Sequence, residues 1–212
     1  MRGLGLQLST IALLGLAGCA YTVPLTPVGV EDISNHRGTK IPGQFSAKIE
    51  TENCCKKEVR SELLMCQAPT YHVNGDQTVE ASIKAALPTI FEDVVIGQND
   101  RANDLTIAIN RFDVTVRFDP VGVLPTVQAT ADVGLTIEAK RGGQSLMKGH
   151  AYAQQANVGR VVLFCAEASS TIADAVNAAT REALNKLTEL MVNSPMLRDL
   201  GGPSSQKRAE AK

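Results

Sequence analysis

Residues 127 to 139 alternate between apolar and polar side chains, and this pattern limits the folds open to the chain. Every second position is apolar: Val127, Ala129, Ala131, Val133, Leu135, Ile137 and Ala139. Most of the positions between them are polar, among them Asp132 and Glu138. Because successive side chains of a strand point to opposite faces, the stretch predicts a long strand in a sheet with one covered face and one face in water.

The stretch before this strand also alternates, but its phase changes once. The apolar residues of the first phase are Leu105, Ile107 and Ile109, and those of the second are Phe112, Val114, Val116 and Phe118. One extra residue at Asn110-Arg111 inverts the faces, which predicts either a β-bulge or a strand that changes its packing partner. Gly142 and Gly143 then predict a tight hairpin turn and a return strand over residues 145–153. A further half-buried strand is predicted over residues 45–51.

The first of two predicted helices follows the turn at residues 74–76. Thr78 offers an N-cap, and an apolar stripe runs from Val79 to Val94. Pro88 lies inside the stripe and predicts a kink or a break near Ala86, because proline removes a backbone donor and crowds the preceding turn.

The second predicted helix begins near Ser170 or Thr171, and Thr171 with Asp174 resembles a capping box. Its stripe consists of Ile172, Val176, Ala179, Ala183, Leu187 and Leu190. Pro195 follows the helix and ends it. At this spacing the stripe is expected to cover the apolar face of the sheet.

These elements predict the α+β class, with two helices packed on one face of an antiparallel sheet. One domain is expected over residues 44–197. Residues 1–18 are predicted to be a lipoprotein signal peptide, and residues 19–43 a lipidated tether and lead segment. Residues 198–212 are predicted to be a disordered tail, because they are rich in glycine, serine and charge.

The leader prediction rests on Arg2 and on the apolar run from Leu4 to Leu16, which is too short to span a bilayer. The four residues at its end, Leu16-Ala17-Gly18-Cys19, resemble the lipobox of bacterial lipoproteins. This resemblance implies cleavage between Gly18 and Cys19 and acylation of Cys19, whose acyl chains then hold the protein in the membrane. The alternatives are an ordinary leader that contains a cysteine and a membrane-spanning signal anchor. By resemblance to the sorting rule of Gram-negative lipoproteins, Ala20 implies the outer membrane.

Four cysteines remain once Cys19 is lipidated: Cys54, Cys55, Cys66 and Cys165. An even number in an exported chain predicts two disulfides. A bond between the neighbours Cys54 and Cys55 would strain the peptide that joins them. We therefore favour the two connectivities in which one of them takes Cys66 and the other takes Cys165. No metal site is predicted, because the histidines show no ligand spacing with these thiols.

Composition and motifs argue against several functions. The net charge of −1 and the 4% content of aromatic residues do not favour nucleic acid as a partner. The carboxylates Asp113, Asp119 and Glu138 lie on predicted strands without a nucleophile or a base in a known catalytic spacing. We therefore expect no enzyme and no cofactor. A membrane-tethered periplasmic enzyme of unknown class is the alternative.

The order of elements and three motifs resemble the YajG-like family of small envelope lipoproteins. The motifs are Asp104-Leu105-Thr106-Ile107, the glycine hairpin, and the start of the second helix at residues 171–177. The resemblance covers about residues 78–191 and implies no assigned activity. More distantly, the layout is similar to lipoproteins that assist lipid or lipopolysaccharide export within larger envelope machines.

The expected function is therefore a non-catalytic accessory or binding module in envelope assembly or maintenance. Its expected place is the periplasmic side of the outer membrane of a Gram-negative bacterium. The expected partners are the membrane, through the acyl chains on Cys19, and another envelope protein or envelope component.

Overall fold

The computed structural model describes seven segments of the chain: residues 20–30, 40–51, 54–61, 69–97, 101–120, 125–160 and 165–201. The predicted signal peptide, Cys19 and Cys66 lie outside the described residues. Cleavage and lipidation therefore stay predictions.

The larger of two sheets has five strands in the order β5-β2-β6-β7-β8. They are β2 (Ile41–Glu50), β5 (Phe91–Ile96), β6 (Asn103–Asp119), β7 (Thr126–Arg141) and β8 (Gln144–Arg160). The predicted antiparallel pairing is confirmed for β6, β7 and β8. It is wrong for β2, which runs parallel to both β5 and β6. Parallel neighbours need a long crossover connection, and a helix between β2 and β5 forms part of it.

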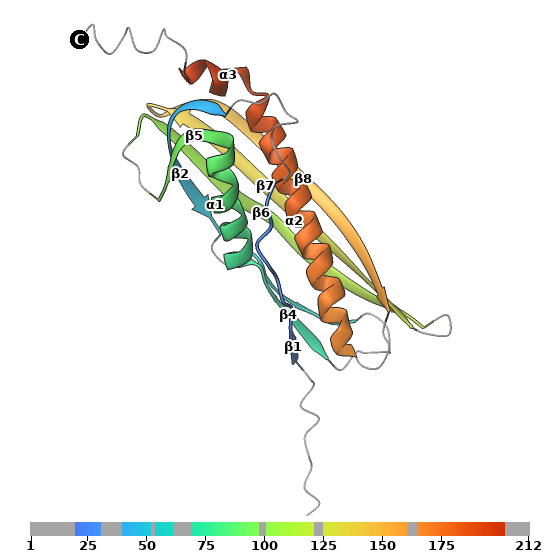
Figure 1. The fold of residues 1–212 in the computed structure, drawn as a ribbon. Coiled ribbons are helices and arrows are strands. Elements are labelled where there is room, and N and C mark those ends of the chain that lie inside the picture. The colour runs from blue at the N-terminus through green and yellow to red at the C-terminus, as the bar shows by residue number, and fades with distance from the viewer. Residues whose placement is uncertain are drawn as a thin grey trace, which may run out of the picture.

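The second sheet is small and was not predicted. It contains β1 (Ala20–Thr22), β3 (Lys56–Val59) and β4 (Thr70–Asn74) in the order β1-β4-β3. Figure 1 shows β1 and β4 at one end of the molecule, beyond the start of α1. Val23 and Val28, from the segment predicted as a lead, are buried in the core.

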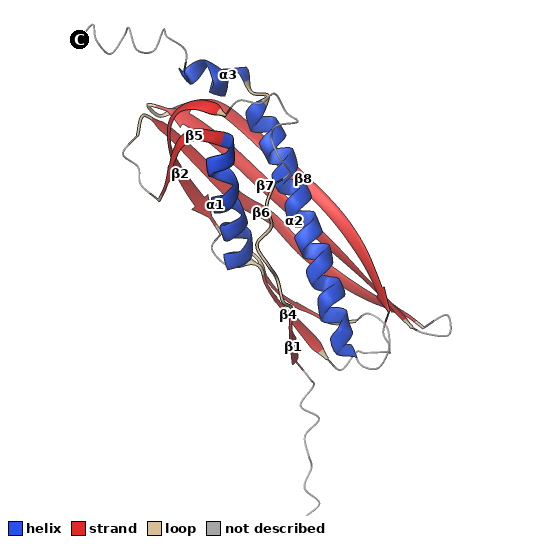
Figure 2. Ribbon diagram, in the orientation of Figure 1, coloured by secondary structure: helices blue, strands red, loops and turns tan. Residues whose placement is uncertain are grey.

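Two long helices, α1 (Asp76–Ile90) and α2 (Ala168–Val192), lie on the same face of the five-stranded sheet, as predicted (Figure 2). α1 ends two residues after Pro88, and Val94 lies in β5 rather than on the helix. α2 begins three residues before Thr171, which is buried within its first turn and does not cap the helix. Among the helices of the described segments, none has the length and apolar character needed to cross a membrane.

The C-terminal end of the described chain forms short helical turns. They are α3 (Pro195–Arg198) and η3 (Asp199–Gly201). A third short turn, η2 (Cys165–Glu167), lies elsewhere in the chain, directly before α2. Part of the segment predicted as a tail therefore has regular structure, and Leu200 packs against the core.

The core lies between the sheet and the two helices. The seven alternating residues of β7 are each no more than 1% exposed, so the predicted covered face is confirmed. Leu187 of α2 is 2% exposed, but Leu190 is 39% exposed, so its assignment to the stripe was wrong. Met191 takes that place, because four residues after Leu187 return to the same side of a helix with 3.6 residues per turn.

The predicted β-bulge is present in β6. The register between β6 and β7 shifts between Ile109 and Arg111, which leaves Asn110 as the extra residue. Gly134 pairs with Arg111, and a Cβ at Gly134 would lie 2.5 Å from Oδ1 of Asn110. A side chain at position 134 would therefore force the side chains of Asn110 and Arg111 in the bulge to shift.

The predicted hairpin between β7 and β8 is also confirmed. Gly142 and Gly143 have φ angles of +55° and +83°. The return strand does not end near Ala153 but continues to Arg160. Its full length pairs with β7.

Candidate functional site

The residues with the most distinctive chemistry lie between β2 and β3, where Cys54 and Cys55 are joined by a disulfide. Their Cα atoms are 3.8 Å apart. The favoured connectivities, in which these two cysteines bond to Cys66 and Cys165, were therefore wrong. Cys165 is itself disulfide-bonded and lies in η2, on another part of the fold.

The peptide between the two cysteines is not the only constraint on the pair. The fold holds Cys55 on both sides. Its N–H donates to Oδ1 of Asp76 at 2.9 Å, and its C=O accepts from the N–H of Gly75 at 2.8 Å. These two bonds fix the backbone of the pair against the start of α1.

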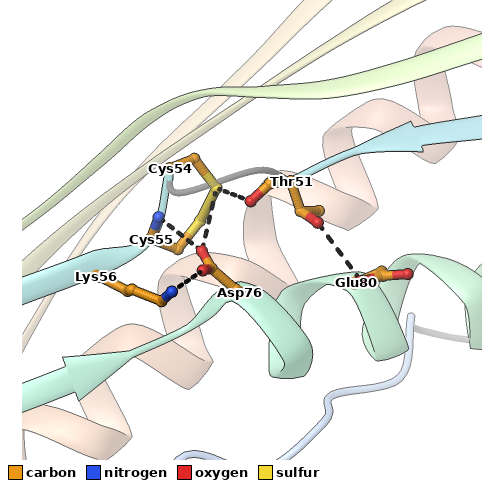
Figure 3. Close-up of a disulfide and its surroundings, with 6 residues drawn as sticks. All are labelled: Thr51, Cys54, Cys55, Lys56, Asp76 and Glu80. Carbon is orange, nitrogen blue, oxygen red and sulfur yellow. Dashed lines mark hydrogen bonds and ion pairs between the residues drawn. A yellow bond between two sulfur atoms is a disulfide. The ribbon is translucent and has the colours of Figure 1, made fainter.

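Asp76 is the centre of the polar contacts around the disulfide (Figure 3). One carboxylate oxygen lies 3.7 Å from Sγ of Cys54, and the other lies 3.4 Å from Nζ of Lys56. Sγ of Cys54 also lies 3.3 Å from the backbone oxygen of Thr51. A carboxylate, a cation and two sulfur atoms thus meet at the N-terminus of a 15-residue helix.

The two cysteines differ in exposure. Cys55 is fully buried, whereas Cys54 is half-buried. Cys54 lines an open pocket of about 390 Å³ together with Lys48, Ile49, Glu50, Ala108 and Ile109. A reagent from solvent therefore reaches the disulfide from the Cys54 side.

Gly75 permits the close packing of this site. A Cβ at Gly75 would lie 2.9 Å from Cζ of Phe112 and 3.2 Å from Cβ of Cys55. Its φ is −90°, which any residue can adopt. Glycine is therefore needed here because there is no room for a side chain, not because the backbone conformation is unusual.

Charges of both signs surround the sulfurs. The dipole at the start of α1 and the nearby Lys56 favour an anion, whereas the Asp76 carboxylate, 3.7 Å from Sγ of Cys54, opposes one. The thiolate is the nucleophilic and metal-binding form of cysteine. In the disulfide form the sulfurs carry no charge, so this chemistry begins only on reduction.

Two of the carboxylates considered from the sequence, Asp113 and Glu138, do not meet. Asp113 forms an ion pair with Lys57 at 2.9 Å, and Glu138 forms one with Lys140 at 3.0 Å. Glu138 lies opposite Thr106, seven residues from Asp113 along β6, which corresponds to about 23 Å of extended strand. These side chains are consistent with a solvated sheet face.

Two tyrosines have raised pKa values for different reasons. Burial, with a smaller contribution from nearby Tyr21, raises the pKa of Tyr71 to about 12. The Tyr71 hydroxyl donates to the backbone oxygen of Cys165 at 2.6 Å and so links β4 to the start of α2. The hydrogen bond to Asp132 is the main cause that raises the pKa of Tyr152, which lies on β8.

Asp76 was not identified from the sequence as part of a site. It lies 21 residues from Cys55, and no spacing rule connects the two positions. The available signal was the turn at residues 74–76, which predicts the start of a helix but not what the helix contacts.

No family model and no curated protein matches this chain. Solved structures are similar at low identity. Protein XCC0632 from Xanthomonas campestris is 16% identical to this chain and superposes with a TM-score of 0.47. The alignment covers 90% of this chain and 99% of that protein. A minor lipoprotein from Acinetobacter baumannii is 11% identical, with a TM-score of 0.38. That alignment covers 74% of this chain and 92% of the lipoprotein. At this level of similarity no function or location is transferred, and the YajG-like resemblance stays a prediction.

Proposed function

We propose that the protein is a lipoprotein of the bacterial envelope, anchored in the outer membrane by acyl chains on Cys19. It acts there as a non-catalytic accessory or binding module in envelope assembly or maintenance. The leader and the lipobox-like sequence at residues 16–19 support the anchor. The observation that carries the proposal is that Ala20, the residue after the predicted lipid attachment, is part of strand β1.

The first residues after Cys19 are firmly held. Ala20 pairs with Thr70 in the parallel β1–β4 ladder, and the ring of Tyr21 stacks on Tyr71 with centroids 5.8 Å apart. The N–H of Val23 donates to the backbone oxygen of His72 at 3.0 Å. An acylated Cys19 would therefore be joined to the domain without a flexible spacer.

This arrangement implies an orientation. With acyl chains at Cys19, the end that carries β1 and β4 faces the bilayer (Figure 1). The opposite end, where α3 lies, then points away from the membrane. Because Ala20 is already paired in β1, a partner that binds the domain would be held at a nearly constant distance from the lipid.

Binding is favoured over catalysis by the state of the charged side chains on the solvated sheet face. Ion pairs on this face include Asp113 with Lys57, Glu138 with Lys140, and Arg111 with Asp132 at 3.6 Å. Charges paired in this way on a sheet face are typical of a solvated or docking surface. A catalytic site instead gathers perturbed groups in a cleft.

Membrane fractionation of three forms of the protein tests the proposal. The wild type should be found in the outer membrane. Cys19→Ser should lose that location because the acyl chains supply nearly all of the membrane affinity. Ala20→Asp should be retained at the inner membrane under the sorting rule, and Ala20 is exposed, so the domain should still fold.

Two results would contradict the proposal: a wild-type protein in the soluble fraction, or Cys19→Ser still in the outer membrane. Crosslinking in intact cells, followed by purification of the protein, then identifies the envelope partner. Crosslinks found only to lipid would argue against a protein partner.

A further inference from the structure

We infer that reduction of the Cys54–Cys55 disulfide creates a binding site for a thiophilic divalent cation, such as Zn²⁺ or Cd²⁺, with both thiolates and the Asp76 carboxylate as ligands. The inference does not depend on the membrane anchor. It rests on the grouping of these three side chains at the start of α1 (Figure 3).

The distances are close to those that a single ion requires. The two sulfurs and a carboxylate oxygen of Asp76 all lie within 4.8 Å of one another. Two ligand atoms that each lie about 2.0–2.3 Å from a zinc ion can be at most about 4.6 Å apart. Small side-chain rotations after the sulfurs separate therefore bring all three atoms to one centre.

The surroundings orient and balance such a ligand set. The N–H of Cys55 and Nζ of Lys56 each contact a different oxygen of Asp76, which holds the carboxylate in place and leaves lone pairs for an ion. Two thiolates and one carboxylate around a divalent cation leave one net negative charge. Lys56 and the N-terminus of α1 offset that charge.

The pocket beside Cys54 provides access and room. Its volume of about 390 Å³ is enough for an ion to enter with bound water. A zinc ion with three protein ligands usually keeps a water molecule or another small ligand at its fourth position. That position would open toward Lys48 and Glu50, which line the pocket.

The redox step needs a dithiol reductant. A thiolate of the reductant attacks Sγ of Cys54, the exposed sulfur, and forms a mixed disulfide while Cys55 leaves as a thiolate. The second thiolate of the reductant attacks its own sulfur in the mixed disulfide and releases Cys54. The reductant becomes a disulfide, and its two electrons and two protons convert the protein disulfide to two thiols. Binding of the cation then releases two thiol protons to solvent.

Titration with Cd²⁺ tests the site in the full-length protein in detergent. The sulfur-to-cadmium charge-transfer absorption in the ultraviolet reports thiolate ligation. After reduction with a phosphine, the protein should bind one equivalent of Cd²⁺ at Cys54 and Cys55 and show the sulfur-to-cadmium absorption band. The oxidised protein should not show this band. Cys54→Ser/Cys55→Ser, which keeps every other cysteine, should lose that equivalent. A double variant that binds as many equivalents of Cd²⁺ as the reduced wild type, or no band in the reduced wild type, would overturn the inference.

Asp76→Asn tests the third ligand. Asparagine keeps an acceptor for the N–H of Cys55 but removes the charge. Its Cd²⁺ affinity should fall by at least about tenfold, the smaller of the losses that changes around a metal usually cause. Asp113→Asn is the matched control, because it also loses an ion pair with a lysine but lies outside the site. An Asp76→Asn affinity equal to wild type would exclude the carboxylate as a ligand.

Alkylation of the reduced wild type gives a test without variants. One equivalent of Cd²⁺ should protect both Cys54 and Cys55 from a maleimide, as mapped by mass spectrometry of the peptides. Full alkylation of either cysteine in the presence of Cd²⁺ would contradict the proposed site.

Discussion

Replacing Leu187 by alanine should destabilise the domain strongly, because this side chain is only 2% exposed on the face of α2 that packs against β7 and β8. The substitution removes three carbon atoms, and at about 0.8 kcal/mol for each buried methylene the lost transfer energy is about 2.4 kcal/mol. The cavity left behind adds to this, so the total is expected at about 3–5 kcal/mol. A domain of this size has a total stability of about 5–15 kcal/mol, so the loss is a large share.

The same helix supplies the control. Leu190 is 39% exposed, so Leu190→Ala should cost less than about 1 kcal/mol. Urea denaturation followed by circular dichroism, without reducing agent, measures both free energies of unfolding. If Leu187→Ala costs no more than Leu190→Ala, then α2 is not part of the core, and its sheet-facing side would become the place to look for a partner.

Three further results are expected. Gly75→Ala should cost about 1–3 kcal/mol in free energy of unfolding, because its Cβ meets the ring of Phe112 at 2.9 Å, whereas Gly29→Ala, which has open space around it, should cost almost nothing. Gly134→Ala should destabilise the bulge by a similar amount, and hydrogen exchange of the neighbouring β6 amides should increase more than that of α1 amides. Burial favours the neutral form of Tyr71 in the folded state, so its protonated hydroxyl contributes at most about 3 kcal/mol to the free energy of unfolding. This contribution should be complete below the unfolded pKa of about 10 and lost as the pH rises to about 12. Tyr71→Phe should flatten the fall in stability over that pH range, and an unchanged fall would show that Tyr71 does not cause it.

Local periodicity was enough to predict the central strands. The alternation along β6 and β7 repeats every two residues, and a change of phase at Asn110 has few structural explanations other than a bulge. The hairpin was equally local, because two successive glycines supply the positive φ angles of its turn. The sequence signal for each of these features lies in consecutive residues of the chain.

The errors came from contacts between distant segments. The parallel pairing of β2 with β5 and β6 depends on where the chain returns after α1, which no local pattern specifies. The full length of β8 was missed because its alternation is weak, and its pairing with β7 decides its end. The small sheet joins Ala20 to Thr70, and such short strands carry little periodic signal.

The candidate site was only half predictable. The cysteines were recognised as disulfide candidates, but the sequence did not reveal that Cys54 and Cys55 pair with each other or that Cys55 is held by Asp76 and Gly75. The carboxylate reaches the sulfurs because α1 begins beside them. That packing comes from the tertiary fold, and the sequence alone does not reveal it.

The proposed location and orientation of the protein both follow from acylation of Cys19. Mass spectrometry of the N-terminal peptide, from protein extracted out of the outer membrane, measures this directly. The account predicts a mature chain that begins at Cys19 and carries one N-linked acyl chain and a diacylglyceryl group on sulfur. A mature chain that begins at another residue, or an unmodified Cys19, would contradict it.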